Sequence, residues 1–195
     1  MPQLGGPEGN ARLTSMTAVA LLVLLALEGV TILFIRPLIS VHVFVGLLLV
    51  PPVALKLAST GWRFASYYAG RPDYVAKGPP QIVLRAVVAP LVVVSTFALF
   101  GTGIAMLAIH PRGGPLLGLH KASFIVWVAA TAVHVLAYIP RLWRLVSGDV
   151  VAASRLPSTG LRLGLVVAAV AAGGLFAAGS FHLASPWLDW VGNRR

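Results

Sequence analysis

The sequence contains no cysteine, and charged side chains make up only 10% of it. Without thiols the chain forms no disulfide, binds no iron–sulfur cluster or thiolate zinc, and attaches no haem covalently in the c-type manner. Acidic residues are the scarcest charges, five against fifteen Lys and Arg. Any metal or cofactor must therefore be held by His, Lys, Met or a carboxylate.

What is abundant is apolar: 58% of the residues are hydrophobic and the mean hydropathy is +0.89. A soluble domain carries roughly 25% charged residues, so this composition excludes an ordinary soluble protein and indicates lipid as the solvent. The excess of basic residues lies between the hydrophobic stretches, where topology signals and anionic lipids place it. We therefore expect contact with membrane lipid and none with nucleic acid.

Five stretches are long enough to cross a bilayer core of ~30 Å, which needs about 20 apolar residues in a helix. They cover residues 14–35, 38–59, 82–109, 116–145 and 161–183. The first has no clear small-residue cleavage site after it and is expected to be a retained helix. The sequence thus predicts an all-α integral membrane helical bundle that forms one domain over residues 1–195.

The basic residues also predict an orientation. With five spans, the N-terminus shares one side of the membrane with the 2–3 and 4–5 connections, and nine of the fifteen Lys and Arg fall on that side. Cytoplasmic loops carry the basic excess. We expect a multi-pass protein of the bacterial inner (cell) membrane with a cytoplasmic N-terminus.

Histidines at regular spacing are the most informative polar residues. His120 and His134 are fourteen residues apart on the predicted fourth helix, which places them about 40° apart on one face and about 21 Å apart along the axis. His42 lies as far into the parallel second helix as His120 lies into the fourth, and Lys56 follows His42 by the same fourteen residues. Ionisable residues inside a membrane span are costly and usually functional, so the two helices are expected to face each other across a site.

Two segments carry a resemblance to a known group: HVFVGLLLVPPVALKLASTGWRF and LHKASFIVWVAATAVHVLAYIPRL. They resemble the four-helix membrane b-type cytochromes, which include respiratory cytochrome b and the cytochrome subunits of formate dehydrogenase and hydrogenase. The resemblance covers the first four helices and implies a four-helix haem-binding core, with the fifth helix packed outside it. It implies haem b held between the second and fourth helices by His42, His120 and His134. One haem is favoured and two are allowed, because only His42 and His120 form a matched histidine pair. Lys56 departs from the group, which has histidine at that place.

Lys56 has three readings from the sequence alone. Its side chain reaches the membrane surface as an ordinary helix-end lysine, neutralises a haem propionate, or ligates iron. Four glycines near the depth of His42 would leave room for a porphyrin between helices, or would serve helix packing alone. These are Gly29, Gly46, Gly101 and Gly103.

Glu28 and His110 are candidates for a quinone or proton site near the first haem, and Glu28 could equally bond a histidine or Arg36. The function expected from the resemblance is electron transfer between the quinone pool and a partner redox protein or larger respiratory complex. The alternatives are a haem-free membrane subunit for complex assembly, a small transporter, and a quinone-reactive enzyme in its own right.

Overall fold

The computed structural model describes residues 6–78, 82–109, 114–152 and 158–192, and these residues form helices and no strands. Five helices among them are long and apolar enough to cross a membrane, and they cover Gly6–Leu33, Ile35–Tyr68, Leu84–Ala108, Pro115–Ala137 and Thr159–Val191. The prediction of an all-α, multi-pass membrane bundle is confirmed.

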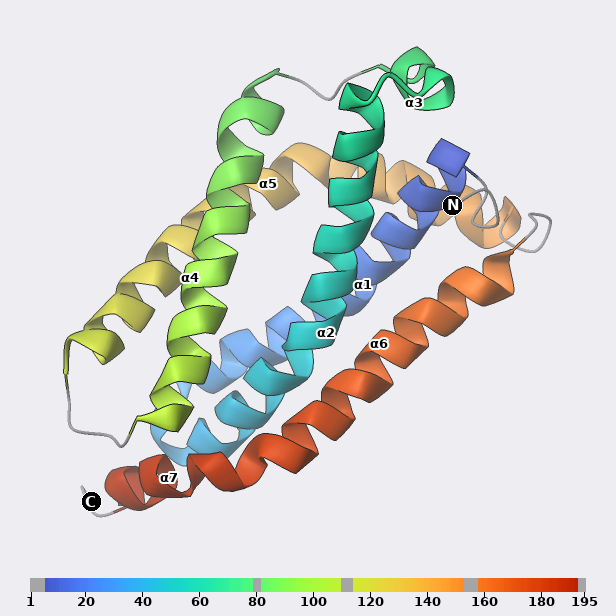
Figure 1. Cartoon of the computed structure of the whole chain (residues 1–195). Helices are drawn as coiled ribbons and strands as arrows, with labels where there is room; N and C mark the ends of the chain where they lie inside the picture. Colours follow the sequence, from blue (N-terminus) through green and yellow to red (C-terminus); the bar gives the residue numbers. More distant parts are fainter. Residues whose placement is uncertain (1–5, 79–81, 110–113, 153–157, 193–195) are drawn as a thin grey trace.

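The helices follow one another as alternating spans with short connecting elements. Their bounds are α1 Gly6–Leu33, α2 Ile35–Tyr68, α3 Pro72–Ala76, the π-helical turn η2 Leu84–Val88, α4 Ala89–Ala108, α5 Pro115–Ala152, α6 Thr159–Ser180, the 3-10 turn η4 Phe181–Ala184 and α7 Ser185–Gly192. The spans run back and forth between one end of the bundle, marked by α3, and the opposite end, marked by α7 (Figure 1). We call these the α3 end and the α7 end.

The second helix is longer than its apolar run. α2 continues past the predicted end at Ser59 to Tyr68, through an aromatic and basic stretch that hydropathy places in a loop. Its last turn is supported by stacking of Phe64 on Tyr68, four residues apart, with ring centroids 4.6 Å apart. Aromatic pairs at this spacing stabilise a helix, so the interfacial segment extends the span.

Two units make up the bundle (Figure 1). In the first, α2 packs closely against both α1 and α6, and in the second, α4 packs closely against α5. Contact between the units is sparser, and Phe100 of α4 contributes to it by packing against a buried cluster of Leu21, Val45 and Leu49. The fifth span was expected outside the core, whereas α6 packs along α2 as extensively as α1 does.

A proline and a glycine explain the close approach of α6 to α2. Pro52 has no N–H to donate to the carbonyl of Leu48, four residues earlier, so that oxygen is left without its helical partner. Gly173 of α6 lies against it, because a Cβ added there would overlap the Leu48 oxygen. The Cα–H of Gly173 therefore points at the freed carbonyl, as in the Cα–H···O contacts common between packed helices.

Candidate functional site

The His42 imidazole is held by two side chains of α1 at the α7 end. Its Nδ1 lies 2.8 Å from Oε1 of Glu28 and 3.2 Å from the hydroxyl oxygen of Thr31. The Thr31 hydroxyl in turn lies 2.6 Å from the backbone carbonyl oxygen of Glu28 and 3.2 Å from its Oε2. Glu28 thus has a histidine partner, one of the two structural roles expected for it.

These contacts fix the position of the ring proton on His42. An ionised carboxylate only accepts hydrogen bonds, and the single hydroxyl hydrogen of Thr31 is directed to Glu28. With Glu28 as the carboxylate, the hydrogen in the 2.8 Å contact is on Nδ1 of His42. In the neutral ring Nε2 then carries a lone pair.

His120 is held in the same way by a different residue. Its Nδ1 lies 3.0 Å from Oγ1 of Thr102, on the facing helix α4. The Thr102 hydroxyl donates its hydrogen to the carbonyl oxygen of Ala98 at 2.7 Å, so it can only accept from His120. Nδ1 of His120 therefore carries the proton, and Nε2 of the neutral ring carries a lone pair.

Both histidines thus offer Nε2 as a donor atom for a metal. Among the described residues, no hydrogen bond engages Nε2 of His42, whereas the His120 ring also has the backbone carbonyl of Leu99 as a hydrogen-bond partner. The two rings come from different units of the bundle, yet they lie close enough for their charges to interact. Imidazole nitrogens are among the donors that hold a haem iron, so His42 and His120 are the residues that would hold such a group here.

The four glycines that the sequence places beside this site divide into two kinds. A Cβ on Gly103 would lie 3.3 Å from Cε1 of His120, and a Cβ on Gly46 would lie 3.6 Å from Oε1 of Glu28. Gly103 therefore leaves room for the His120 ring, and Gly46 leaves room for the Glu28 carboxylate. Gly29 and Gly101 have no neighbouring atom within 4 Å of such a Cβ, so they touch no side chain of the site.

The second predicted pair, Lys56 and His134, has a different setting toward the α3 end. Nζ of Lys56 donates to the backbone carbonyl of Thr14, on α1, at 2.8 Å. The carbonyl and hydroxyl of Ser59, one turn further along α2, bond to Asn10 at 2.9 Å and to Thr14 at 3.0 Å. Lys56 interacts electrostatically with His134, but its amine is directed into a polar contact that ties α2 to α1.

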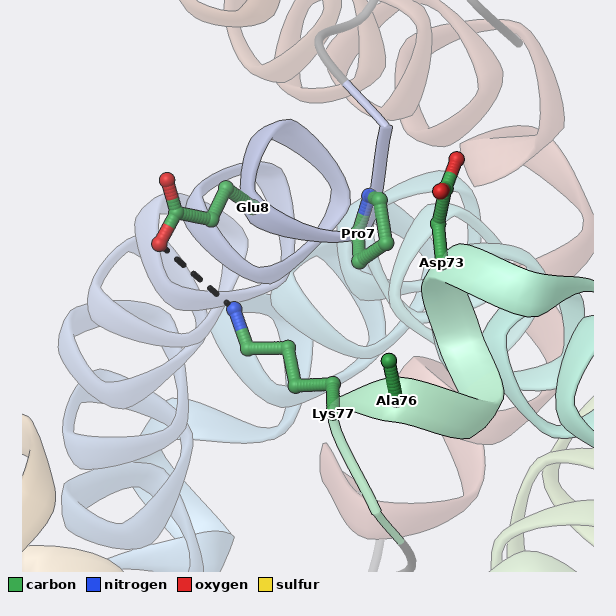
Figure 2. Close-up of a pocket in the computed structure, with 5 residues that line it drawn as sticks. All are labelled: Pro7, Glu8, Asp73, Ala76 and Lys77. Atoms are coloured by element: carbon green, nitrogen blue, oxygen red, sulfur yellow. Dashed lines mark ion pairs between the residues drawn. The ribbon is translucent and has the colours of Figure 1, made fainter.

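Other candidate groups are less informative. His110 lies outside the described residues. An open surface pocket of about 520 Å³ at the α3 end is lined by Pro7, Glu8, Asp73, Ala76 and Lys77, and Figure 2 shows Lys77 directed at Glu8 across it. The amine and carboxylate are 3.7 Å apart, and Glu8 is 76% exposed. This contact joins the start of α1 to α3 and offers no nucleophile or metal ligand set.

Sequence reasoning missed two residues of the site, Thr31 and Thr102. The signal available was position: Thr31 is three residues after Glu28, and Thr102 stands between Gly101 and Gly103 at the depth of His120. Within the described part of the chain, no group of three or more His, Cys, Asp or Glu side chains is placed to hold a metal ion. Comparison with known protein families, curated proteins and solved structures finds no match to this chain.

Proposed function

We propose that this chain is a membrane b-type cytochrome that transfers electrons between the quinone pool and a partner redox protein. His42 of α2 and His120 of α5 would hold one haem b at the α7 end. The observation that carries the proposal is the shared arrangement of the two rings, each anchored through Nδ1 and each left with the Nε2 lone pair. The haem would supply the one-electron chemistry.

Anchoring of this kind is typical of histidines that bind metals. A ligating imidazole usually donates its second ring N–H to a carboxylate, hydroxyl or carbonyl, which fixes the tautomer and the ring orientation. Glu28 does this for His42, and Thr102 does it for His120. The carboxylate also makes Nε2 of His42 the stronger electron donor of the two.

The architecture supports a shared ligand between the two units. His42 belongs to the α1–α2–α6 unit and His120 to the α4–α5 hairpin, and these units touch each other only sparsely. A group bound by both histidines would join them. This role accounts for two costly ionisable residues placed at one depth of a membrane span.

A single haem is favoured over two. A second iron with two ligands would need a lone pair from Lys56 directed toward His134. Instead, Nζ of Lys56 donates to the backbone carbonyl of Thr14, on α1. Lys56 then offers no ligand to an iron bound by His134. We propose that this end of the bundle is held by polar contacts alone.

The proposal includes a topology. We place the protein in a bacterial inner membrane with the α3 end in the cytoplasm, because the basic residues near that end follow the positive-inside rule. The haem would then lie toward the outer face. Electrons would pass there to or from a partner, as expected of a subunit of a larger respiratory complex.

The decisive experiment is a reduced-minus-oxidised absorption spectrum of the protein purified from haem-replete cells, with the haem-to-protein ratio. We expect a b-type spectrum at one haem per chain. His42→Ala and His120→Ala should each abolish stoichiometric haem, while His134→Ala should retain it. A colourless wild-type protein would instead identify a haem-free subunit in which the same contacts serve only as hydrogen bonds between helices.

The quinone assignment needs its own measurement. Addition of a quinol to the oxidised protein should reduce the haem, and a quinone-site inhibitor should slow this reduction. A haem that accepts electrons from dithionite and not from quinol would leave the cytochrome assignment in place and remove the quinone pool as the partner.

A further inference from the structure

The α3 end carries two arginines whose guanidinium groups lie over aromatic rings of α2. The Arg71 guanidinium lies 4.7 Å from the ring centroid of Trp62, and that of Arg85 lies 5.8 Å from the ring of Tyr68. Arg71 follows the end of α2, and Arg85 lies in the first turn of the next span. The two arginines therefore lie where the membrane-spanning part of the bundle ends.

The first arginine sits on a fixed support. The indole N–H of Trp62 donates to the hydroxyl of Tyr74 at 3.2 Å, and Tyr74 is buried with 8% exposure. Arg71 itself is exposed, and its backbone carbonyl caps α3 by accepting from Tyr74 and Val75. Ring and guanidinium are thus pre-organised before any ligand arrives, which lowers the entropic cost of binding.

Neither arginine is paired with a carboxylate in the part of the chain that the structure describes. Within the described ranges, no ion pair or side-chain hydrogen bond involves the guanidinium of Arg71 or Arg85. Asp73 is close in sequence to Arg71 but forms no ion pair with it in that part of the chain, and Glu8 is engaged by Lys77. A guanidinium stacked on a ring keeps its N–H donors in its own plane, free to form bidentate bonds with a phosphate.

The aromatic residues near the two arginines favour a phospholipid headgroup over a soluble phosphate. Tyr68 lies under Arg85, its ring contacts that of Phe64, and the two residues are 58% and 56% exposed, so large aromatic faces lie beside this charge. Aromatic side chains of this kind belong at the level of lipid headgroups, where acyl chains meet them on one side and phosphates on the other. A soluble phosphate would gain nothing from these faces.

We propose that the Trp62–Arg71 and Tyr68–Arg85 pairs form a binding site for anionic phospholipid headgroups at the α3 end of the bundle. The arginines bind the phosphate, and the exposed aromatic rings contact the glycerol and the upper acyl chains. This site is separate from the histidine site at the opposite end and does not depend on haem.

The test uses the full chain in nanodiscs of phosphatidylcholine, with and without about one third phosphatidylglycerol. We expect phosphatidylglycerol to raise the thermal unfolding temperature of the wild type and to be retained in native mass spectra. An Arg71→Gln and Arg85→Gln double variant should lose most of this gain, with retention falling about fivefold for each arginine, the effect of one basic residue at an anionic surface. The gain is measured against the same variant in pure phosphatidylcholine, so a general loss of stability does not imitate the result.

Lys77→Gln is the matched control. It removes one positive charge from the same end of the bundle, but Lys77 stacks on no ring and pairs with Glu8. It should keep the phosphatidylglycerol gain. An equal loss in Lys77→Gln, an unchanged gain in the double variant, or the same gain from inorganic phosphate added to phosphatidylcholine nanodiscs would each overturn the proposal.

Discussion

Replacement of Gly173 by alanine tests the packing of α6 on α2 with a single methyl group. The added Cβ would overlap the carbonyl oxygen of Leu48 and lie 3.0 Å from its carbonyl carbon and 3.3 Å from its Cα. Carbon atoms in good contact are about 3.5–4.0 Å apart. All three neighbours are backbone atoms of a helix and cannot rotate away, so α6 must move outward from α2.

The expected cost follows from two opposing effects. Overpacking a well-filled contact costs typically 1–3 kcal/mol, with the loss of a Cα–H···O contact worth perhaps 0.5–1 kcal/mol included in the damage. Alanine is better than glycine in a helix by roughly 1 kcal/mol. We therefore expect Gly173→Ala to lower the free energy of unfolding by about 0–2 kcal/mol overall, and by about 1–3 kcal/mol relative to a glycine-to-alanine change that meets no neighbour.

The adjacent residue provides the control. A Cβ on Gly174 would meet no atom within 4 Å, so Gly174→Ala brings the same helix preference without the collision and should leave the protein as stable or up to about 1 kcal/mol more stable. The two variants have the same amino-acid composition and differ only in which of two adjacent glycines is replaced. Equilibrium unfolding in mixed detergent micelles, followed by helical circular dichroism, measures both.

Two outcomes would refute this reasoning. If Gly173→Ala proves as stable as Gly174→Ala, α6 does not approach α2 through Gly173. If both are destabilised equally, the effect belongs to the helix and not to its contact with Leu48.

Three further predictions concern the histidine site. Thr102→Val keeps the shape of the side chain but removes the hydroxyl that His120 contacts, and in a haem titration it should weaken haem binding by about 10–100-fold, as loss of a ligand's supporting contact does. The control is Thr96→Val, which breaks the 2.9 Å hydrogen bond from Trp127 between the same helices and should leave the haem affinity unchanged. Lys56→Met should keep the haem-to-protein ratio, since the amine bonds α1 and no ligand role is assigned to it, and a loss of haem would reopen the second site. Removal of haem should weaken the contact between the two units and lower the free energy of unfolding by roughly 4 kcal/mol relative to protein with haem at a thousand times its dissociation constant. The measurement is the rate of proteolysis of the α4–α5 hairpin, which should rise without haem. Equal cleavage rates with and without haem would contradict a bridging role.

The sequence predicted the number and type of the membrane-spanning segments, because these depend on the lipid that surrounds the chain. Five apolar runs give the five spans, because each is long enough for a helix, which satisfies its backbone hydrogen bonds within one segment in lipid. Counting residues along parallel helices also predicts an equal depth for His42 and His120. It needed no knowledge of side-chain positions.

Contacts between individual side chains could not be predicted from the sequence, because they depend on how each helix is rotated about its axis relative to its neighbour. Gly173 and Gly174 are indistinguishable as letters, yet only one faces Leu48. Thr31 and Thr102 are two among many hydroxyl residues, and their role appears only when the ring nitrogen they meet is known. The extension of α2 to Tyr68 was hidden because hydropathy reports the apolar core of a membrane and not the interfacial helix beyond it.

The end of the chain bears on the order in which the molecule is assembled. After α6, η4 and α7 cross the α7 end of the bundle, where Phe181 packs on Phe44 of α2 and the indole of Trp187 donates to the carbonyl of Met106 on α4 at 2.6 Å. These contacts fasten together the two units that carry the histidines. Because η4 and α7 follow α2 and α5 in the chain, these contacts form only after both histidine-bearing helices have been synthesised.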